Sequence, residues 1–421
     1  MTATTARSPT SKPSPPKFPS AAGSSLTTPA AISPAPPSGK ATKPSPAPSR
    51  SCRPSVSKTS STSATTASLN ASPPESSTAR VRVFLPTYRR HALLPRAVAS
   101  LRAQSFQNWI CELHNDDPAD PFPGELVAGL ADPRIHFVQH ARNLGPIETF
   151  NRFYQPTAEP FVALLEDDNT WEPTFLETML AAMDAHPSVT LAWCNQHIIQ
   201  EDPDGHLTDT NTFANPPSPS SGPAAVSPRL QPWGQLRQIT GALHANGAML
   251  LRSRPGQSYP TPQIPFGCVE AFRERMFPHP LLYVPQPLAT FTITQQTART
   301  NSARDWSAAL ALLAASFLKH ARLSSDESRQ LCADFRSQRP PMTDTLISAA
   351  LQCREARALL RHITPRDWFH YTLRFFRPPL TAFHTLRARS RHPDWWDLLD
   401  RETAARFQET SSSARPPQAV P

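Results

Sequence analysis

Between residues 81 and 165 the sequence alternates short apolar runs with amphipathic segments, and this alternation constrains the fold more than any other feature. The apolar runs have the length and composition of strands, and the segments between them place apolar residues three and four positions apart, which predicts helices. Predicted strands occupy residues 81–86, 109–114, 134–140 and 160–165, and predicted helices occupy residues 91–106, 124–131 and 146–155. This order predicts βαβ units and a mostly parallel sheet with helices on both faces.

Polar residues follow each of these predicted strands. The segments are "PTYRR", "NDDPAD", "ARNLG" and "EDDN", in chain order. In open α/β sheets ligands bind beyond the carboxyl ends of the strands. We therefore expect the functional site to be built from these four segments.

The composition of the chain predicts two irregular ends around a folded middle. Residues 1–78 are mostly Ser, Thr, Ala and Pro and contain few large apolar side chains, so this segment is expected to be a disordered tail. The expected division is an α/β domain over residues 79–300 with an irregular insertion at 201–232, a helical extension over 301–408, and a second disordered tail over 409–421. Within the first domain we expect a late helix at 265–277 and a closing strand at 281–293.

Charge and cysteine usage exclude several classes of protein. The formal net charge is +9, but the tail holds +7 of it and the rest of the chain only +2, so the folded part is not expected to bind nucleic acid. The six cysteines form no C-x-x-C pair, which argues against a zinc ribbon and against a disulfide framework. No apolar run approaches the roughly 20 residues that span a bilayer, and we expect a cytoplasmic protein.

Three carboxylates stand in a row directly after the apolar run at 160–165. Glu166, Asp167 and Asp168 would repel one another at the end of a buried strand unless a cation lies beside them. A divalent metal ion is the first candidate. A solvated acidic turn is the alternative for the triplet taken alone.

The ordered series "VFLPTYRR", "HNDDPAD", "ARNLGPIETFNR" and "LLEDDNTW" resembles the family 2 glycosyltransferases over about residues 80–291. The resemblance implies an α/β fold with the GT-A-type nucleotide-diphospho-sugar transferase sheet and flanking helices. It also implies an inverting transfer of a sugar from a nucleotide-diphospho-sugar donor to the hydroxyl of a glycan or lipid-linked acceptor. The usual role in this family is the synthesis of cell-envelope or exported polysaccharide.

The resemblance also implies a divalent metal ion, Mn²⁺ or Mg²⁺, held by an acidic motif that precedes an aromatic residue. Aligning Trp171 with that aromatic residue puts Glu166 and Asp168 at the two acidic positions of the metal motif, with Asp168 as the best metal ligand and Glu166 expected to face the ribose or a metal-bound water. Because side chains alternate along a strand, we expect Glu166 and Asp168 to share one side and Asp167 to point elsewhere.

By the same resemblance, residues at the ends of the predicted strands would bind the nucleotide: Pro86, Thr87, Tyr88, Asp116, Asp117, Arg142, Asn143 and Asp167. Asp116 or Asp117 would accept a hydrogen bond from the base. An Asx turn is the alternative for "NDDP".

The general base that the family places on a late helix would be Glu270, with Glu274 as the second candidate. The alternative for Glu270 is a surface ion pair with Arg273. The histidine that the family often has after its closing strand is absent here, and Arg299 is the candidate contact to the diphosphate in its place.

Two further interpretations remain open. The altered motifs are compatible with a degenerate copy of the fold that acts as a scaffold or binding protein. The segment at 366–396 interleaves arginines with aromatic residues, which is compatible with peripheral contact at the inner face of the cell membrane, with nucleic-acid binding, or with helices packed on the catalytic domain.

Overall fold

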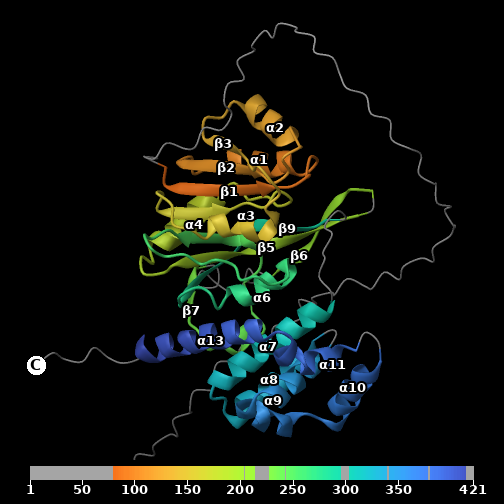
Figure 1. Ribbon diagram of the computed structural model, residues 1–421. Helices are drawn as coiled ribbons and strands as arrows, with labels where there is room; N and C mark the ends of the chain where they lie inside the picture. The colour runs from red at the N-terminus through yellow and green to blue at the C-terminus, as the bar shows by residue number, and fades with distance from the viewer. Residues whose placement is uncertain are drawn as a thin grey trace, which may run out of the picture.

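A computed structural model describes residues 79–202, 204–213, 227–241, 243–294, 303–338, 341–377 and 380–413. The expected N-terminal tail, Arg299 and most of the expected C-terminal tail lie outside these residues. The described chain has two parts, a sheet with helices on both faces and a group of helices that follows it (Figure 1). Of the described helices, none is long and apolar enough to cross a membrane.

The sheet contains nine strands, and its two halves differ in direction. Their order across the sheet is β3 (Ile135–Gln139), β2 (Trp109–Asn115), β1 (Val81–Thr87), β4 (Phe161–Leu164), β8 (Met249–Arg252), β5 (Leu191–Glu201), β9 (Leu281–Ile293) and β7 (Arg229–Gln231), with β6 (Leu207–Thr212) paired to β5. The first four strands pair in parallel, as predicted. In the second half only β5 and β9 are parallel, so the prediction of a mostly parallel sheet is wrong there.

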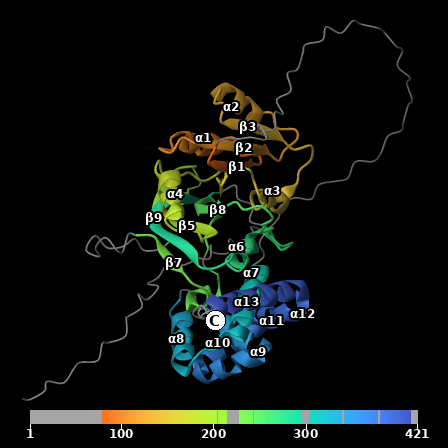
Figure 2. The same ribbon diagram turned by 90° about the vertical axis from the view of Figure 1, so that its left-hand side faces the viewer.

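Alternating side chains of the central strands pack in two separate hydrophobic cores, one on each face of the sheet. In β1 the side chains of Val81, Val83 and Leu85 share a core with buried residues of α1 (Leu94–Arg102) and α4 (Phe175–Asp184), and α2 (Phe122–Leu130) packs against the same core. Phe84 points to the opposite face, where it packs with Phe153 of α3 (Gly145–Phe153). Figure 2 shows α4 and α3 on opposite sides of the strands. Burial of each large apolar side chain contributes about 1.5–3 kcal/mol, so both faces of the sheet stabilise the fold.

The helical part consists of α7 (Ala303–His320), α8 (Ser325–Ser337), α9 (Thr343–Gln352), the 3-10 segment η5 (Arg354–His362), α10 (Pro365–Phe376), α11 (Thr381–Leu386), α12 (Ala388–Arg391) and α13 (Pro393–Ser413). One hydrophobic core joins these helices to the sheet part, because Trp233 and Phe272 pack in the same cluster as the α7 side chains. Buried Arg275 adds polar links: its Nε donates to Thr403 Oγ1 (3.1 Å) and its Nη2 to the Leu313 carbonyl oxygen (3.1 Å). The helices are therefore packed directly against the sheet part.

Two expected segments differ from the structure. The region 201–232, expected to be irregular, contains β6 and β7, because the long β5 and β9 extend beyond the sheet centre and offer edges for pairing. The expected helix at 265–277 is short. Its first turn is the 3-10 segment η4 (Phe266–Cys268), and only α6 (Val269–Arg273) is α-helical. Pro265 and Gly267 weaken the start of that helix.

Candidate functional site

The segment 87–90, at the end of β1, contacts the acidic residues that follow β2 and β4. Arg89 Nε donates to Asp117 Oδ2 (2.6 Å), the Tyr88 backbone N–H donates to Asp167 Oδ2 (3.3 Å), and Arg90 Nη2 lies 3.8 Å from Asp168 Oδ2. Arg89 has a φ of 56°, which is uncommon for a residue with a side chain and is typical of functional sites. The segment "PTYRR" therefore brings Asp117, Asp167 and Asp168 to one edge of the sheet.

Glu166 points away from this segment, toward the 3-10 turn η3 (Asn246–Ala248). Its carboxylate accepts hydrogen bonds from Asn246 Nδ2 (3.2 Å), the Gly247 backbone N–H (3.3 Å) and Asn169 Nδ2 (2.8 Å). The expectation that Glu166 and Asp168 share one side is wrong. The physical reason is that β4 ends at Leu164, so the triplet lies in a turn, where strand alternation does not apply.

Trp171 is the residue that aligns with the family's aromatic residue after the acidic motif, and in the structure it belongs to the core. It stacks on Phe175 with 4.2 Å between ring centroids, and its Nε1 donates to the Gly247 carbonyl oxygen (2.6 Å). Since η3 contacts both Glu166 and Trp171, the indole ring fixes the position of the acidic turn.

The acidic turn is poorly compensated in charge. Burial, together with the neighbouring Asp167 and Glu166 charges, raises the pKa of Asp168 well above its usual range, and Arg90 lowers it only in part. Burial likewise raises the pKa of Asp167, and burial with the Glu270 charge raises that of Glu166. Raised carboxyl pKa values mean that ionisation costs free energy here, and a bound divalent cation would remove that cost.

The residues present fit such a cation through Asp168 in the first place. Asp168 faces outward with a side chain that is 18% exposed, and its nearest positive group is Arg90 at 3.8 Å. Glu166 is already held by three donors. One or two protein carboxylates completed by phosphate oxygens are the usual ligand set for Mg²⁺ beside a nucleotide.

The two neighbouring aspartates after β2 have different surroundings. Asp116 accepts hydrogen bonds from the backbone N–H groups of Leu144 (2.7 Å) and Gly145 (2.9 Å) and contacts His140 Nδ1 (2.9 Å), so it holds the start of α3. Asp117 instead faces Arg89 on the side of the acidic turn. The Arg89 hydrogen bond lowers the pKa of Asp117, which stays ionised at neutral pH. Asp117 is therefore the better placed of the two to meet a ligand at this edge.

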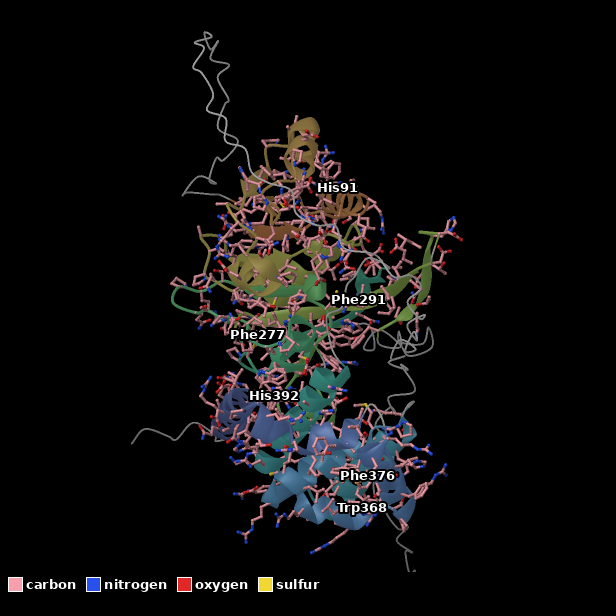
Figure 3. The ribbon with its side chains drawn as sticks, turned by 45° about the vertical axis from the view of Figure 1, so that its right-hand side comes forward. His91, Phe277, Phe291, Trp368, Phe376 and His392 are labelled. Atoms are coloured by element: carbon pink, nitrogen blue, oxygen red, sulfur yellow. The ribbon has the colours of Figure 1, made fainter. Side chains whose placement is uncertain are left out.

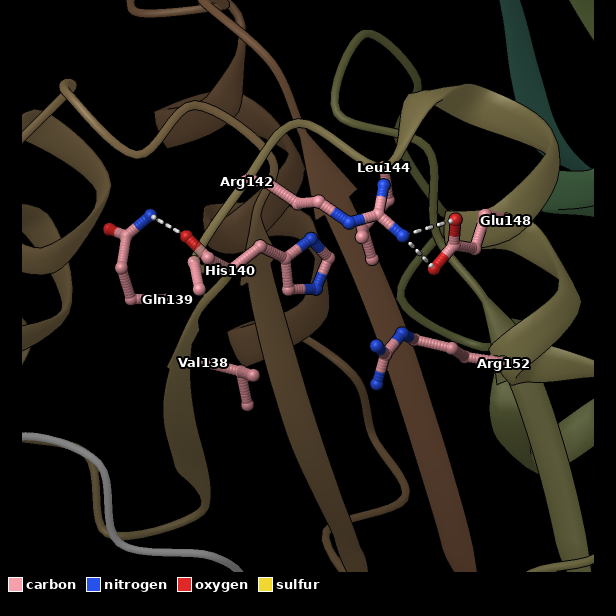
Figure 4. A pocket seen from close by; sticks show the side chains of 8 residues that line it. Val138, Gln139, His140, Arg142, Leu144, Glu148 and Arg152 are labelled. Atoms are coloured by element: carbon pink, nitrogen blue, oxygen red, sulfur yellow. Dashed lines mark hydrogen bonds and ion pairs between the residues drawn. The ribbon is translucent and has the colours of Figure 1, made fainter.

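Arg142 lines a hollow of about 640 Å³ between β3 and α3, together with Val138, His140, Glu148 and Arg152 (Figure 4). Its Nη2 lies 3.1 Å from both carboxylate oxygens of Glu148, and both side chains are exposed. Asn143, beside Arg142, donates from Nδ2 to the Asp116 carbonyl oxygen (3.2 Å). This hollow is not lined by any carboxylate of the acidic turn, so it adjoins the site at the Asp116 side only.

Glu270, in the first turn of α6, lies on the Glu166 side of the acidic turn. The charge of Glu270 raises the pKa of Glu166, so the two carboxylates are close enough to repel each other. The Glu270 side chain is 30% exposed, and its Oε2 lies 3.7 Å from His244 Nδ1. The His244 ring packs edge-on against Phe213 and Phe291 (4.6 and 4.4 Å between centroids). Glu270 is thus a partly exposed carboxylate beside an imidazole.

Glu274, the second candidate for the base, is contradicted by its surroundings. Its side chain is fully buried, accepts from Gln238 Nε2 (2.8 Å) and pairs with Arg237 (3.4 Å) and His279 (3.9 Å). Arg237 and the other partners more than overcome the effect of burial and lower the pKa of Glu274 to about 2. A buried carboxylate that is so weakly basic and fully engaged is structural.

Glu274→Gln should destabilise the fold by about 3 kcal/mol at pH 7, because it breaks a buried ion pair. The folded-state pKa is lowered, so the stabilisation is present above the ordinary value near 4.3 and is lost as the pH falls toward 2. Urea denaturation of both proteins at pH 7 and pH 3 checks this. An equal difference at both pH values would contradict the assignment.

Sequence reasoning missed two positively charged residues of the site. Arg90 follows the quoted "PTY" and approaches Asp168, and its place in "PTYRR" was the only signal for it. Arg273 is 1% exposed, its Nε and Nη1 have no hydrogen-bond partner, and its charge lowers the pKa of Glu166. The alternative expected from the sequence is an ion pair between Glu270 and Arg273 on the helix surface, whereas the structure buries the Arg273 side chain.

Comparison with known proteins finds one family model, partial relatives and solved structures that are similar to this chain. Residues 82–232 match the family model described as Glycosyl transferase family 2. An uncharacterized protein of Sinorhizobium fredii (strain NBRC 101917 / NGR234), y4gI, is 30% identical over 124 residues, which is 29% of this chain and 14% of that protein. The Escherichia coli (strain K12) putative colanic acid biosynthesis glycosyl transferase WcaA is 24% identical over 121 residues, which is 28% of this chain and 43% of that protein. The chain thus spans less than half the length of either relative.

Among solved structures, residues 1–349 of S. aureus TarS give a TM-score of 0.46 at 14% identity, covering 76% of this chain and 90% of that chain. A mannosyltransferase from Pyrobaculum calidifontis, solved with GDP-Man and Mn²⁺, gives 0.40 at 11% identity, covering 80% and 90%. The family match itself begins in β1, includes Asp117 and the acidic turn, and ends just after β7. Residues 82–232 of this chain are therefore similar to the family 2 glycosyltransferases.

Proposed function

We propose that this protein transfers a sugar from a nucleotide-diphospho-sugar to an acceptor hydroxyl, with inversion at the anomeric carbon. The observation that carries the proposal is the convergence of Asp117, Asp167 and Asp168 on the segment 87–90 at the carboxyl ends of β1, β2 and β4. In an open α/β sheet this edge is where ligands bind.

The donor would lie along the segment that follows β1. Asp117 is ionised and would accept a hydrogen bond from the ring N–H of the base, beside Pro86, Thr87 and the exposed Tyr88. Arg89 and Arg90 now pair with Asp117 and Asp168, and a diphosphate would give both guanidinium groups a stronger anionic partner. We propose that Arg142 and Asn143 border the far side of this nucleotide pocket.

A divalent ion would be held by Asp168 and by the phosphate oxygens of the donor, with Asp167 beside the ribose. Such an ion stabilises the negative charge that grows on the leaving diphosphate. Glu166, held by its three donors, would keep the turn in shape and would not bind the ion. This revises the ligand pair expected from the sequence to a single protein carboxylate at the ion.

Glu270 would remove the proton of the acceptor hydroxyl. As the acceptor oxygen bonds to C1 of the sugar, the bond from C1 to the diphosphate oxygen breaks, and the proton passes to a Glu270 oxygen. The site holds Glu270 across the acidic turn from the segment 87–90, on the side of Glu166 and His244. An attack from the side opposite the leaving group gives inversion.

We further propose a role in the synthesis of cell-envelope or exported polysaccharide, on a glycan or lipid-linked acceptor at the cytoplasmic face of the membrane. Support comes from WcaA, a relative named for colanic acid biosynthesis. The match covers 28% of this chain and 43% of WcaA, so it supports this role only through the matched part of the chain.

A scaffold built on a degenerate copy of the fold is the second candidate. One observation favours it: Arg89 and Arg90 already pair with two of the acidic groups, so the edge is partly neutralised by the chain itself. A scaffold would not need a nucleotide or a metal ion.

Thermal unfolding of the full chain with nucleoside diphosphates and their sugars, with and without Mn²⁺, separates the two candidates. The transferase account predicts that one nucleotide raises the melting temperature and that Mn²⁺ enlarges this rise. A ligand at a hundredfold excess over its Kd stabilises the folded state by roughly 3 kcal/mol. Asp117→Asn should lose the preference among bases while keeping the response to Mn²⁺. No rise with any saturating nucleotide would favour the scaffold.

A further inference from the structure

Two phenylalanines on α10 (Pro365–Phe376) are the most exposed large apolar side chains among the described residues. Phe369 is 65% exposed and Phe376 is 74% exposed. They are seven residues apart, so they lie on one stripe of the helix about 10 Å apart along its axis. Leu373, on the same stripe, is partly exposed. Figure 3 shows Phe376 at the end of the molecule that is away from the sheet, with Trp368 of the same helix nearby.

A basic row runs beside this apolar stripe. Arg366, His370 and Arg377 are exposed. Arg366 and His370 lie one turn apart on the neighbouring strip of the helix surface, and Arg377 is the residue that caps the helix C-terminus. The opposite face of the helix is anchored by Asp367 and Tyr371, which are buried. The helix therefore has a buried inner face and an exposed outer face, and the outer face carries an apolar row beside a cationic row.

A hollow of about 500 Å³ opens along the basic row. Its polar lining includes Arg336, Arg366, His370, Arg374, Asp344 and Asp367. Both carboxylates are already paired: Asp367 accepts from Arg336 (2.8 Å) and Asp344 from Arg374 (3.1 Å). Arg366 has no carboxylate within ion-pair distance among the described residues, so this wall of the hollow keeps an uncompensated positive charge.

The charge of the surrounding chain has the same sign. Residues 341–377 contain six arginines and three acidic residues, Asp344, Glu355 and Asp367. Two of those three acidic side chains are taken up by the ion pairs just described. The outer face of this region is thus cationic as well as apolar.

We propose that the outer face of α10 docks on the surface of an anionic lipid bilayer. Phe369 and Phe376 would enter the boundary between headgroups and acyl chains, while Arg366, Arg377 and the adjoining hollow would meet lipid phosphates. Aromatic residues beside arginines on one exposed helix face are typical of helices that lie in this interface. Single-stranded nucleic acid needs a basic groove that follows its backbone, whereas here both rows run along one outward-facing helix.

The test is co-sedimentation of the full chain with vesicles of two compositions. One is phosphatidylcholine alone, and the other contains about 30 mol% phosphatidylglycerol, which makes the vesicle surface negative. Binding is expected only with the anionic vesicles and is expected to weaken as salt rises. The double variant Phe369→Ser, Phe376→Ser should bind them roughly tenfold more weakly, because it loses the apolar insertion. Arg366→Glu with Arg377→Glu should weaken binding at least as much.

Leu351→Ser is the matched control, since Leu351 is also exposed (37%) in the helical part but lies on α9. It should bind vesicles like the unaltered chain. The melting temperatures of all variants, and their response to nucleotide with Mn²⁺, should be unchanged, so a failure of the membrane proposal is distinguishable from a failure of the transferase proposal. Equal vesicle binding by the double phenylalanine variant, equal binding to neutral vesicles, or binding to a single-stranded oligonucleotide without binding to vesicles would each overturn the inference.

Discussion

Asp168→Asn is expected to lower sugar transfer about a thousandfold or more while stabilising the metal-free protein at alkaline pH. The loss of transfer follows from the loss of the carboxylate that would hold the ion at the leaving diphosphate. The gain in stability follows from the cost of ionising Asp168 beside Asp167 and Glu166 in a partly buried turn. We expect a gain of about 1–3 kcal/mol in the free energy of unfolding.

The sign of this effect depends on pH. The pKa of Asp168 is raised in the folded state, so below the unfolded value near 3.9 both states are protonated and the side chain makes no difference. As the pH rises through 3.9 toward the folded value, the unfolded state ionises freely and the folded state loses stability relative to it. The variant should therefore match the unaltered protein at about pH 3 and exceed it at pH 8.

Urea denaturation at the two pH values, in the presence of a chelator, measures the stability, and release of nucleoside diphosphate from the donor measures the activity. Adding Mn²⁺ with nucleotide should stabilise the unaltered protein and not the variant. A variant that is less stable at pH 8, or that keeps its response to Mn²⁺, would contradict the assignment of Asp168.

Glu270→Gln is expected to lower kcat by about a hundredfold to ten-thousandfold with little change in donor binding. A general base contributes in this range, and glutamine keeps the size and hydrogen-bonding reach of the side chain but cannot take a proton. Donor binding should persist because Glu270 lies across the acidic turn from Arg89 and Arg90. Transfer assays and the nucleotide-dependent rise in melting temperature measure the two quantities separately.

Glu125→Gln provides the matched control, since Glu125 also lies in the first turn of its helix and is exposed, but on α2. It should leave transfer unchanged. The same loss of transfer in both variants, or a loss of donor binding with Glu270→Gln, would remove Glu270 from the role of base.

The sequence predicts the first half of the sheet well because its signals there are local. β1 and β4 are short, mostly apolar runs with residues buried on both faces of the sheet, and the closing strand at 281–293 matches the bounds of β9. The direction of β8 and the pairing of β6 with β5 are set by contacts between segments far apart in the chain, so periodicity does not reveal them. The hydrophobic core that joins Trp233 to α7 is of the same kind.

The site shows the same division between local and non-local signals. The sequence predicts that polar residues gather at the strand ends. It does not predict which residue of each acidic pair faces outward. Asp116 and Asp117 are adjacent, and only the position of α3 assigns Asp116 to the Leu144 and Gly145 backbone N–H groups. Similarly, the end of β4 at Leu164 turns Glu166 inward.

The most direct test of the account is the position of Mn²⁺ in crystals of the protein grown with a nucleoside diphosphate, located by its anomalous scattering. The account predicts one ion bound by an Asp168 oxygen and by the diphosphate, with the base beside Asp117. An ion elsewhere, for example on the exposed Asp202, Asp204 and His206 group, with no ion at Asp168, would contradict the proposed site.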